Sequence, residues 1–196
     1  MFNNLRSSRV VDLTIFNTEN TTDMSYLFGS DGRIENKLYN NVTHVIVGEQ
    51  FSTKNVTNMS GMFTNARSFN QDLSGFDFSK TTYSNALYDF VSSSKLSVEN
   101  YDKLLKKWHT QLKDNPVVHQ PKSYGLKYCE AATEHDYLKN TKNWEFNDNK
   151  DCSSLNLAPA DITISNAQVN ENNAPNFELA DITVTNDPND IPNDTN

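Results

Sequence analysis

Long apolar runs are missing from this chain of 196 residues. No segment approaches the roughly 18 consecutive apolar residues that a membrane-spanning helix requires. The N-terminal stretch from Met1 to Arg6 also lacks the apolar core of a signal peptide. The sequence therefore predicts no membrane span, and these first residues taken alone indicate a cytoplasmic protein.

Positive charge is also scarce. The chain has 17 Lys and Arg residues against 25 Asp and Glu residues, which leaves a net charge of −8. Because recognition of phosphate groups needs clustered Lys and Arg side chains, this balance argues against a nucleic-acid partner. The acidic balance fits an exposed, soluble surface, and cation binding is the second interpretation.

Motifs for catalysis are absent as well. Only six glycines occur, so loops able to cradle a phosphate are scarce, and no Gly-x-Ser-x-Gly or His-Glu-x-x-His arrangement is present. The two cysteines, Cys129 and Cys152, are too far apart for a Cys-x-x-Cys metal pair, and no third thiol assists them. They form a disulfide or remain two free thiols. The sequence predicts that the protein is not an enzyme.

Asn, Thr, Ser and Asp are abundant, and they favour turns, strands and short capped helices. A repeat is visible within this composition. Residues 51–63 resemble residues 16–28, and they read Phe-Ser-Thr-Lys-Asn-Val-Thr-Asn-Met-Ser-Gly-Met-Phe. A more divergent third copy begins at Phe76. The first interval is longer than the second, which predicts a loop between the first two copies.

The middle copy has a recognisable apolar pattern. Four residues have the spacing of one face of a short helix: Met59, Met62, Phe63 and Ala66. Thr57 or Asn58 would cap this helix, and the alternation from Phe76 to Phe78 predicts a strand with one buried side. Such a unit cannot bury its apolar side alone. It must stack on its neighbours, which predicts a solenoid.

The segment from Asn55 to Ser79 begins with Asn-Val-Thr-Asn-Met-Ser-Gly-Met-Phe and ends with Phe-Asn-Gln-Asp-Leu-Ser-Gly-Phe-Asp-Phe-Ser. It resembles the BspA-type, leucine-rich-repeat-like repeat of bacterial surface proteins. That family is also described as a domain of unknown function in lipoproteins and secreted proteins. The likeness is specific over residues 51–79 and looser over 10–30 and 80–92. It implies a curved β-solenoid outside the cell that binds rather than catalyses and has no cofactor in its repeats.

A helix is predicted to begin after Ser97, its cap, and to end before Asp114-Asn115-Pro116. Its apolar stripe is typical of a packed core and consists of Tyr101, Leu104, Leu105, Trp108 and Leu112. We expect this helix to close the end of the solenoid, because exposed terminal repeats need a cap.

A second helix is predicted after Ala132, followed by a strand from Trp144 to Phe146 and a turn from Asp148 to Cys152. Secreted members of the repeat family look similar here, which extends the likeness to residues 10–153. The two cysteines flank this helix–strand unit, and this position favours a disulfide over two free buried thiols. Because disulfides persist in oxidising compartments, the bridge and an extracellular location depend on each other.

From Ser153 onward the composition changes to Asn, Asp, Ala and Pro, with two alternating runs at 162–164 and 182–184 that predict strands. This stretch is similar to the first two strands of a bacterial cadherin-like repeat. The resemblance implies calcium binding by four residues: Glu171, Asp187, Asn189 and Asp190. Oxygen-rich turns suit Ca²⁺. The alternative is an Asn/Asp-rich disordered tail.

We therefore expect an α/β repeat protein with four parts. These are solenoid repeats at 1–95, a helical, disulfide-closed cap at 96–153, a linker at 154–158, and a truncated cadherin-like β-sandwich segment or disordered tail at 159–196. Both ends lie inside structural units, which indicates a fragment of a longer protein.

The predicted function is a non-catalytic, adhesion-type module of a surface or secreted protein that binds a protein or glycan outside the cell. A calcium-associated stalk would follow it in the intact parent. Candidate contact positions are Asn65, Arg67, Gln71 and the insert at 31–39. The alternative is an accessory, non-catalytic region of a secreted hydrolase.

Overall fold

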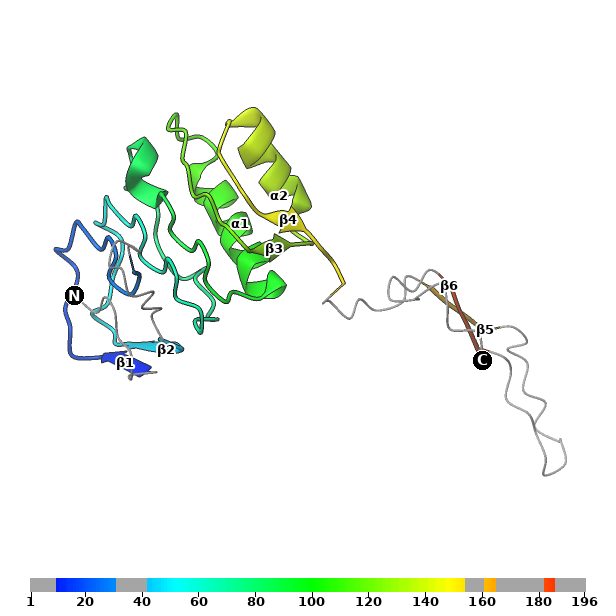
Figure 1. The fold of residues 1–196 in the computed structure, drawn as a ribbon, viewed down its shortest axis with the longest axis horizontal. Helices are drawn as coiled ribbons and strands as arrows, with labels where there is room; N and C mark the ends of the chain where they lie inside the picture. Colours follow the sequence, from blue (N-terminus) through cyan, green and yellow to red (C-terminus); the bar gives the residue numbers. More distant parts are fainter. Residues whose placement is uncertain (1–9, 31–41, 154–160, 165–181, 186–196) are drawn as a thin grey trace, which may run out of the picture. The chain divides into compact units, whose positions relative to one another are not determined.

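The computed structural model describes residues 10–30, 42–153, 161–164 and 182–185 (Figure 1). The chain divides into two compact units, residues 1–152 and 153–196. Within the first unit, we call residues 10–30 and 42–95 the repeat stack and residues 96–152 the cap.

The repeat stack begins with two short parallel strands, β1 (Val10–Leu13) and β2 (His44–Val47), in which Val11 lies opposite Val45. The side chains of Val11 and Leu13 are buried, whereas Val10 and Ile46 on the other face are half exposed. The sequence analysis predicted neither strand.

Consecutive copies of the repeat run parallel and are joined by backbone hydrogen bonds between alternate residues. The N–H groups of residues 24, 26, 28 and 30 donate to the carbonyl groups of 58, 60, 62 and 64 at 2.8–2.9 Å. In turn, the N–H groups of residues 59, 61, 63 and 65 donate to the carbonyl groups of 86, 88, 90 and 92 at 2.7–2.8 Å. Each copy is therefore paired along its length with the next one.

This pairing shows that the predicted helix at 59–66 is wrong. The segment is a series of turns in which Met62 N–H donates to Met59 O and Ala66 N–H to Phe63 O, and Gly61 and Asn65 have positive φ angles. An α-helix would need its own N–H groups for internal bonds, but alternate N–H groups here bind the third copy.

The predicted strand from Phe76 to Phe78 is also wrong, because no strand among the described residues pairs with it. Side chains bind its backbone instead. Asp77 N–H donates to Thr53 Oγ1 at 2.7 Å, and Phe78 N–H donates to Gln111 Oε1 at 2.9 Å.

Aromatic rings fill the interior of the repeat stack. Phe28 stacks on Phe63 with ring centroids 5.2 Å apart, and Phe63 meets Phe90 edge to face at 5.6 Å. Phe78 continues the row to Trp108 of the cap at 6.0 Å. All five side chains are at most 1% exposed, so the stack and the cap share one core.

Short polar turns close the copies. Asp or Asn side chains accept a hydrogen bond from the N–H of a serine two residues later, at 2.8–3.1 Å, in four pairs: Asp23–Ser25, Asn58–Ser60, Asp72–Ser74 and Asp77–Ser79. These Asx turns satisfy backbone groups that have no regular strand or helix partner. They explain the recurrent Asp/Asn-x-Ser pattern of the repeat.

The cap is built around α1 (Val98–Leu112), which contacts both the repeat stack and α2 (Ala132–Asp136) (Figure 1). The predicted helix is confirmed: the Ser97 side chain accepts from Asn100 N–H at 3.3 Å, and the predicted apolar stripe is buried. The second predicted helix is present as α2 and a π-helical turn, η2 (Tyr137–Thr141). The remaining helical element, η1 (Ser84–Leu87), is a 3-10 turn in the third copy.

Two short strands complete the cap, β3 (Lys127–Tyr128) and β4 (Asn149–Lys150), and they pair in parallel. The predicted strand at 144–146 is wrong, since only Phe146 forms an isolated bridge, with Lys122. Residues 149–150, predicted as part of a turn, are a strand because Asn149 N–H and Asp151 N–H bind a segment more than 20 residues earlier.

The second unit contains two antiparallel strands, β5 (Asp161–Ile164) and β6 (Ile182–Thr185), with Ile162 opposite Val184. The two strands predicted from the alternating runs are confirmed. The linker at 154–158 lies outside the described residues, as do the four predicted calcium ligands, Glu171, Asp187, Asn189 and Asp190.

Candidate functional site

Phe16, Phe51 and Phe76 open the three copies of the repeat, and the structure places each of them half-buried against the core. We call these three residues the phenylalanine ladder. The rings of Phe51 and Phe76 have centroids 6.0 Å apart. A residue at the same position of successive parallel copies recurs along one side of the stack.

Two cavities lie along the ladder. The first, of about 300 Å³, is lined by Phe16 and Phe51. The second, of about 380 Å³, is lined by Phe51 and Phe76. Because Phe51 lines both, the cavities are neighbours, and we call them together the ladder groove.

The walls of the ladder groove combine apolar and acidic side chains. Leu13, Met24 and Leu27 extend the apolar lining of the first cavity, and the half-exposed Val47 extends that of the second. Three carboxylates lie at the walls: Asp23 in the first cavity, and Asp72 and Asp77 in the second. Among the described residues that line the groove, Lys54 is the one positively charged side chain.

The three carboxylates are held in their charged form. Burial by itself would raise the pKa of Asp23, Asp72 and Asp77. Hydrogen bonds from the serine two residues later oppose this effect, together with Asn58 at Asp23, Lys103 at Asp72, and Lys107 and Lys54 at Asp77. The pKa of each carboxyl therefore lies below its ordinary value, and the Asx turns help to keep the three groups charged.

Two of the contact residues predicted from the sequence, Asn65 and Gln71, also join parts of the repeat stack. Asn65 donates from Nδ2 to Ser30 O at 3.0 Å, which joins two copies of the repeat. Gln71 accepts from Val45 N–H at 2.6 Å and donates to Val45 O at 3.4 Å, so its amide continues the pairing of β2. Arg67 is exposed outside the groove, and the insert at 31–39 lies outside the described residues.

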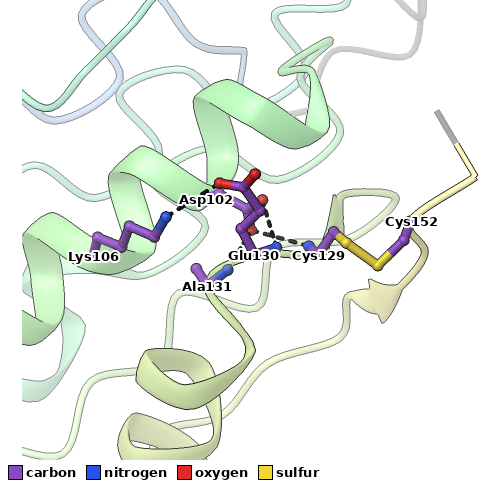
Figure 2. Close-up of a disulfide and its surroundings, with 6 residues drawn as sticks. All are labelled: Asp102, Lys106, Cys129, Glu130, Ala131 and Cys152. Carbon is purple, nitrogen blue, oxygen red and sulfur yellow. Dashed lines mark hydrogen bonds and ion pairs between the residues drawn. A yellow bond between two sulfur atoms is a disulfide. The ribbon is translucent and has the colours of Figure 1, made fainter. Parts of the chain in front are cut away.

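In the structure, Cys129 and Cys152 are bonded to each other, with Cα atoms 5.0 Å apart. Beside this disulfide, Asp102 of α1 reaches the loop that precedes α2 (Figure 2). The 2% exposed Asp102 accepts hydrogen bonds from the N–H groups of Cys129, Glu130 and Ala131 at 2.9–3.1 Å. One carboxylate thus anchors the disulfide-bearing loop to the main helix.

A second polar network lies inside the cap. Tyr101 donates to Asp148 Oδ2 at 2.5 Å, and His135 Nε2 lies 3.0 Å from Asp148 Oδ1. Burial raises the pKa of Tyr101 well above its ordinary value, and the negative charge of Asp148 adds to this effect. The His135 and Asp148 side chains are each 1% exposed. We therefore interpret this network as a structural link between α1, α2 and the residues before β4.

The sequence pattern marks the phenylalanines of the ladder as repeat positions but not as a site. Their recurrence at one position of each copy was the available signal. Nothing in the sequence indicated that Asp102 and Asp148 are buried, because their partners lie 13 or more residues away.

Within the described ranges, no helix is both long enough and apolar enough to cross a membrane. In the same ranges, no group of three or more His, Cys, Asp or Glu side chains is placed to hold a metal ion.

Comparison with known families gives one match. Residues 1–115 match the family described as Mycoplasma protein of unknown function, DUF285, and the chain belongs to this family. Neither a curated protein nor a solved structure matches the chain.

Proposed function

We propose that this protein is a non-catalytic interaction module of a surface or secreted protein, and that it binds its partner through the ladder groove. The observation that carries this proposal is the groove itself, in which two adjacent cavities lined by both apolar and charged side chains follow the repeat. Pockets of this composition are typical of binding sites. The most acid–base-like arrangement, that of His135 and Asp148, is buried away from solvent.

We further propose that the repeats form a short BspA-type, leucine-rich-repeat-like solenoid that the cap closes at one end. The parallel hydrogen bonds between successive copies and the core shared with Trp108 support this assignment. A stack of such units needs a cap at an exposed end, and α1 covers the phenylalanine row at that end.

An extracellular location is part of the proposal. The Cys129–Cys152 disulfide supports it, because disulfides persist in oxidising compartments and are rare in the cytosol. For the second unit we propose a calcium-associated, cadherin-like stalk in the intact parent, and the antiparallel β5–β6 pair supports this. Calorimetry with Ca²⁺ on protein that contains the complete second unit tests it, and the absence of binding heat removes the calcium proposal.

A binding screen with two matched variants tests the interaction function. Val47→Arg places a long charged side chain in the second cavity, whereas Val10→Arg makes the same change at a similarly exposed position of the same sheet. The folded chain and both variants are applied to arrays of extracellular-matrix proteins and glycans. We expect ligands bound by the parent chain and by Val10→Arg to be lost by Val47→Arg. Binding that both variants retain would move the site away from the groove.

A further inference from the structure

We propose that the ladder groove binds an extended, positively charged polypeptide segment of another protein. This inference rests on the proposed binding function and adds the chemical class of the ligand. It is carried by the repeat spacing of the groove and by the charge of its walls.

The spacing of the ladder suits an extended chain. Alternate side chains of a β-strand lie on one face and are roughly 6.5–7 Å apart. The ring centroids of Phe51 and Phe76 are 6.0 Å apart, with one cavity on either side of Phe51. A segment that runs across the copies can therefore place alternate side chains in successive cavities.

The charges select a cationic segment. Asp23, Asp72 and Asp77 all have pKa values below the ordinary value and carry negative charge at neutral pH. Lys54 lines the second cavity, Lys103 pairs with Asp72 at 3.4 Å and Lys107 lies near enough to lower the pKa of Asp77, while the chain as a whole carries a net charge of −8. The overall field of the chain therefore attracts positive charge, and Asp23 adds a carboxylate to the first cavity.

Lys and Arg side chains match both features of the groove at once. Their aliphatic stems pack on apolar surface while the charged head stays at a polar rim. A cation near the face of a Phe ring gains further attraction from the electrons of the ring. Phe51 and Phe76 offer the rings, and Asp77, next to Phe76, offers the carboxylate.

The test uses synthetic peptides of defined charge. The probe is a ten-residue peptide of alternating Lys and Leu, and a peptide with Glu in place of Lys is its control. Titration calorimetry is carried out with the whole chain at 50 mM and 500 mM salt. We expect the Lys peptide to bind and the Glu peptide not to bind. Binding should weaken about tenfold at the higher salt, because the Debye length shortens from about 14 Å to about 4 Å.

Matched variants distinguish binding at the groove from attraction to the overall negative charge of the chain. Asp77→Asn removes a charge from the groove and keeps an oxygen that can accept from Ser79 N–H. Asp12→Asn removes a charge from the same kind of Asx turn, bonded to Thr14, outside the groove. We expect a five- to tenfold loss of affinity in Asp77→Asn, equivalent to about 1.0–1.4 kcal/mol, and a change below twofold in Asp12→Asn.

Four outcomes would overturn the inference. Equal losses in Asp77→Asn and Asp12→Asn would show unspecific attraction, and equal binding of the Glu peptide would remove the role of charge. If neither peptide binds, the ligand class is wrong. An oligosaccharide or neutral protein that binds the parent chain and Val10→Arg but not Val47→Arg would refute this inference and leave the proposed function intact.

Discussion

The repeat stack and the cap share one aromatic core, yet different interactions hold them together. In the stack, backbone N–H groups of alternate residues pair with the next copy, and Asx turns recur. In the cap, single side chains make the links: Asp102 binds three N–H groups, Asp148 joins Tyr101 to His135, and one disulfide closes the loop.

This difference has a consequence for robustness. Backbone pairing does not depend on side-chain identity, so many similar hydrogen bonds each contribute a small part of the stability of the stack. A buried carboxylate with several donors has no replacement if it is lost. We expect the replacement of a polar side chain to cost little stability in the stack and much more in the cap.

The largest effect is expected for Asp102→Ala. The change leaves the N–H groups of Cys129, Glu130 and Ala131 without their acceptor, and each lost partner of a buried donor costs about 1–3 kcal/mol. We expect urea denaturation to show a loss of about 3–5 kcal/mol in the free energy of unfolding. The control Asp23→Ala removes an exposed Asx turn and should cost about 1 kcal/mol or less. Similar losses in both variants would contradict the comparison.

The disulfide should contribute the next largest effect. Cys129 and Cys152 are 23 residues apart, and the chain-entropy model predicts a contribution of about 3 kcal/mol for a loop of this length. We expect the double variant Cys129→Ser/Cys152→Ser to lose this stability. A reducing agent should lower the urea midpoint of the parent chain but not that of the double variant. Free thiols found by mass spectrometry after oxidising export would refute the bridge.

His119 lies where the cap meets the stack, and it should make stability depend on pH. Its ring is fully buried and lies edge to face on Trp144. Burial lowers its pKa from 6.5 to about 4, and polar contact with the backbone of Thr81 and Ser84 opposes this shift only in part. The unfolded chain therefore takes up a proton between pH 6.5 and 4 that the folded protein does not.

Because the pKa of His119 is lower in the folded protein, its contribution to the free energy of unfolding is complete above pH 6.5 and decreases as the pH falls toward 4. We expect the free energy of unfolding to be about 2 kcal/mol lower at pH 5 than at pH 7.5 from this residue. His119→Phe should flatten this part of the pH profile, whereas the exposed His44→Phe should not. Identical slopes in the two variants would show that His119 does not cause the effect.

The smallest effect on stability is expected for two glycine substitutions within the stack, one where two copies pack closely and one in an open turn. A Cβ at Gly29 would collide with the carbonyl oxygen of Gly61 in the next copy, whereas a Cβ at Gly75 would meet nothing within 4 Å. We expect Gly29→Ala to lower the thermal midpoint, with a cost of about 1–2 kcal/mol, and Gly75→Ala to be neutral or slightly stabilising. A neutral Gly29→Ala would mean that the copies are less closely stacked.

Elements whose signal is contiguous in the sequence could be predicted. Helix α1 has a cap, Ser97, and an apolar stripe with helical spacing, and both lie within one segment. The strands β5 and β6 follow from strict alternation over four residues. In contrast, β1 and β2 pair across an interval of more than 30 residues, and no local pattern indicated which segment would lie beside Val10–Leu13.

The residues from Met59 to Ala66 show that a sequence pattern can predict side-chain burial without predicting backbone conformation. Their spacing predicted a helix with one buried face, and the four side chains of that face are buried as predicted. The backbone is a series of turns, because its alternate N–H groups donate to residues 86–92. The pattern thus identified the burial of these side chains and misidentified the backbone conformation.

The amino-acid sequence by itself determined the repeat, the helix that follows it, the alternating strands near the end of the chain and the positions of the two cysteines. The tertiary structure decided how the copies pair, that Phe16, Phe51 and Phe76 border a groove, and that Asp102 and Asp148 are buried. The physical reason is the range of the interactions. Side-chain periodicity and capping act within a few residues. Hydrogen bonds between copies and buried carboxylates join residues far apart in the chain, which meet only in the folded protein.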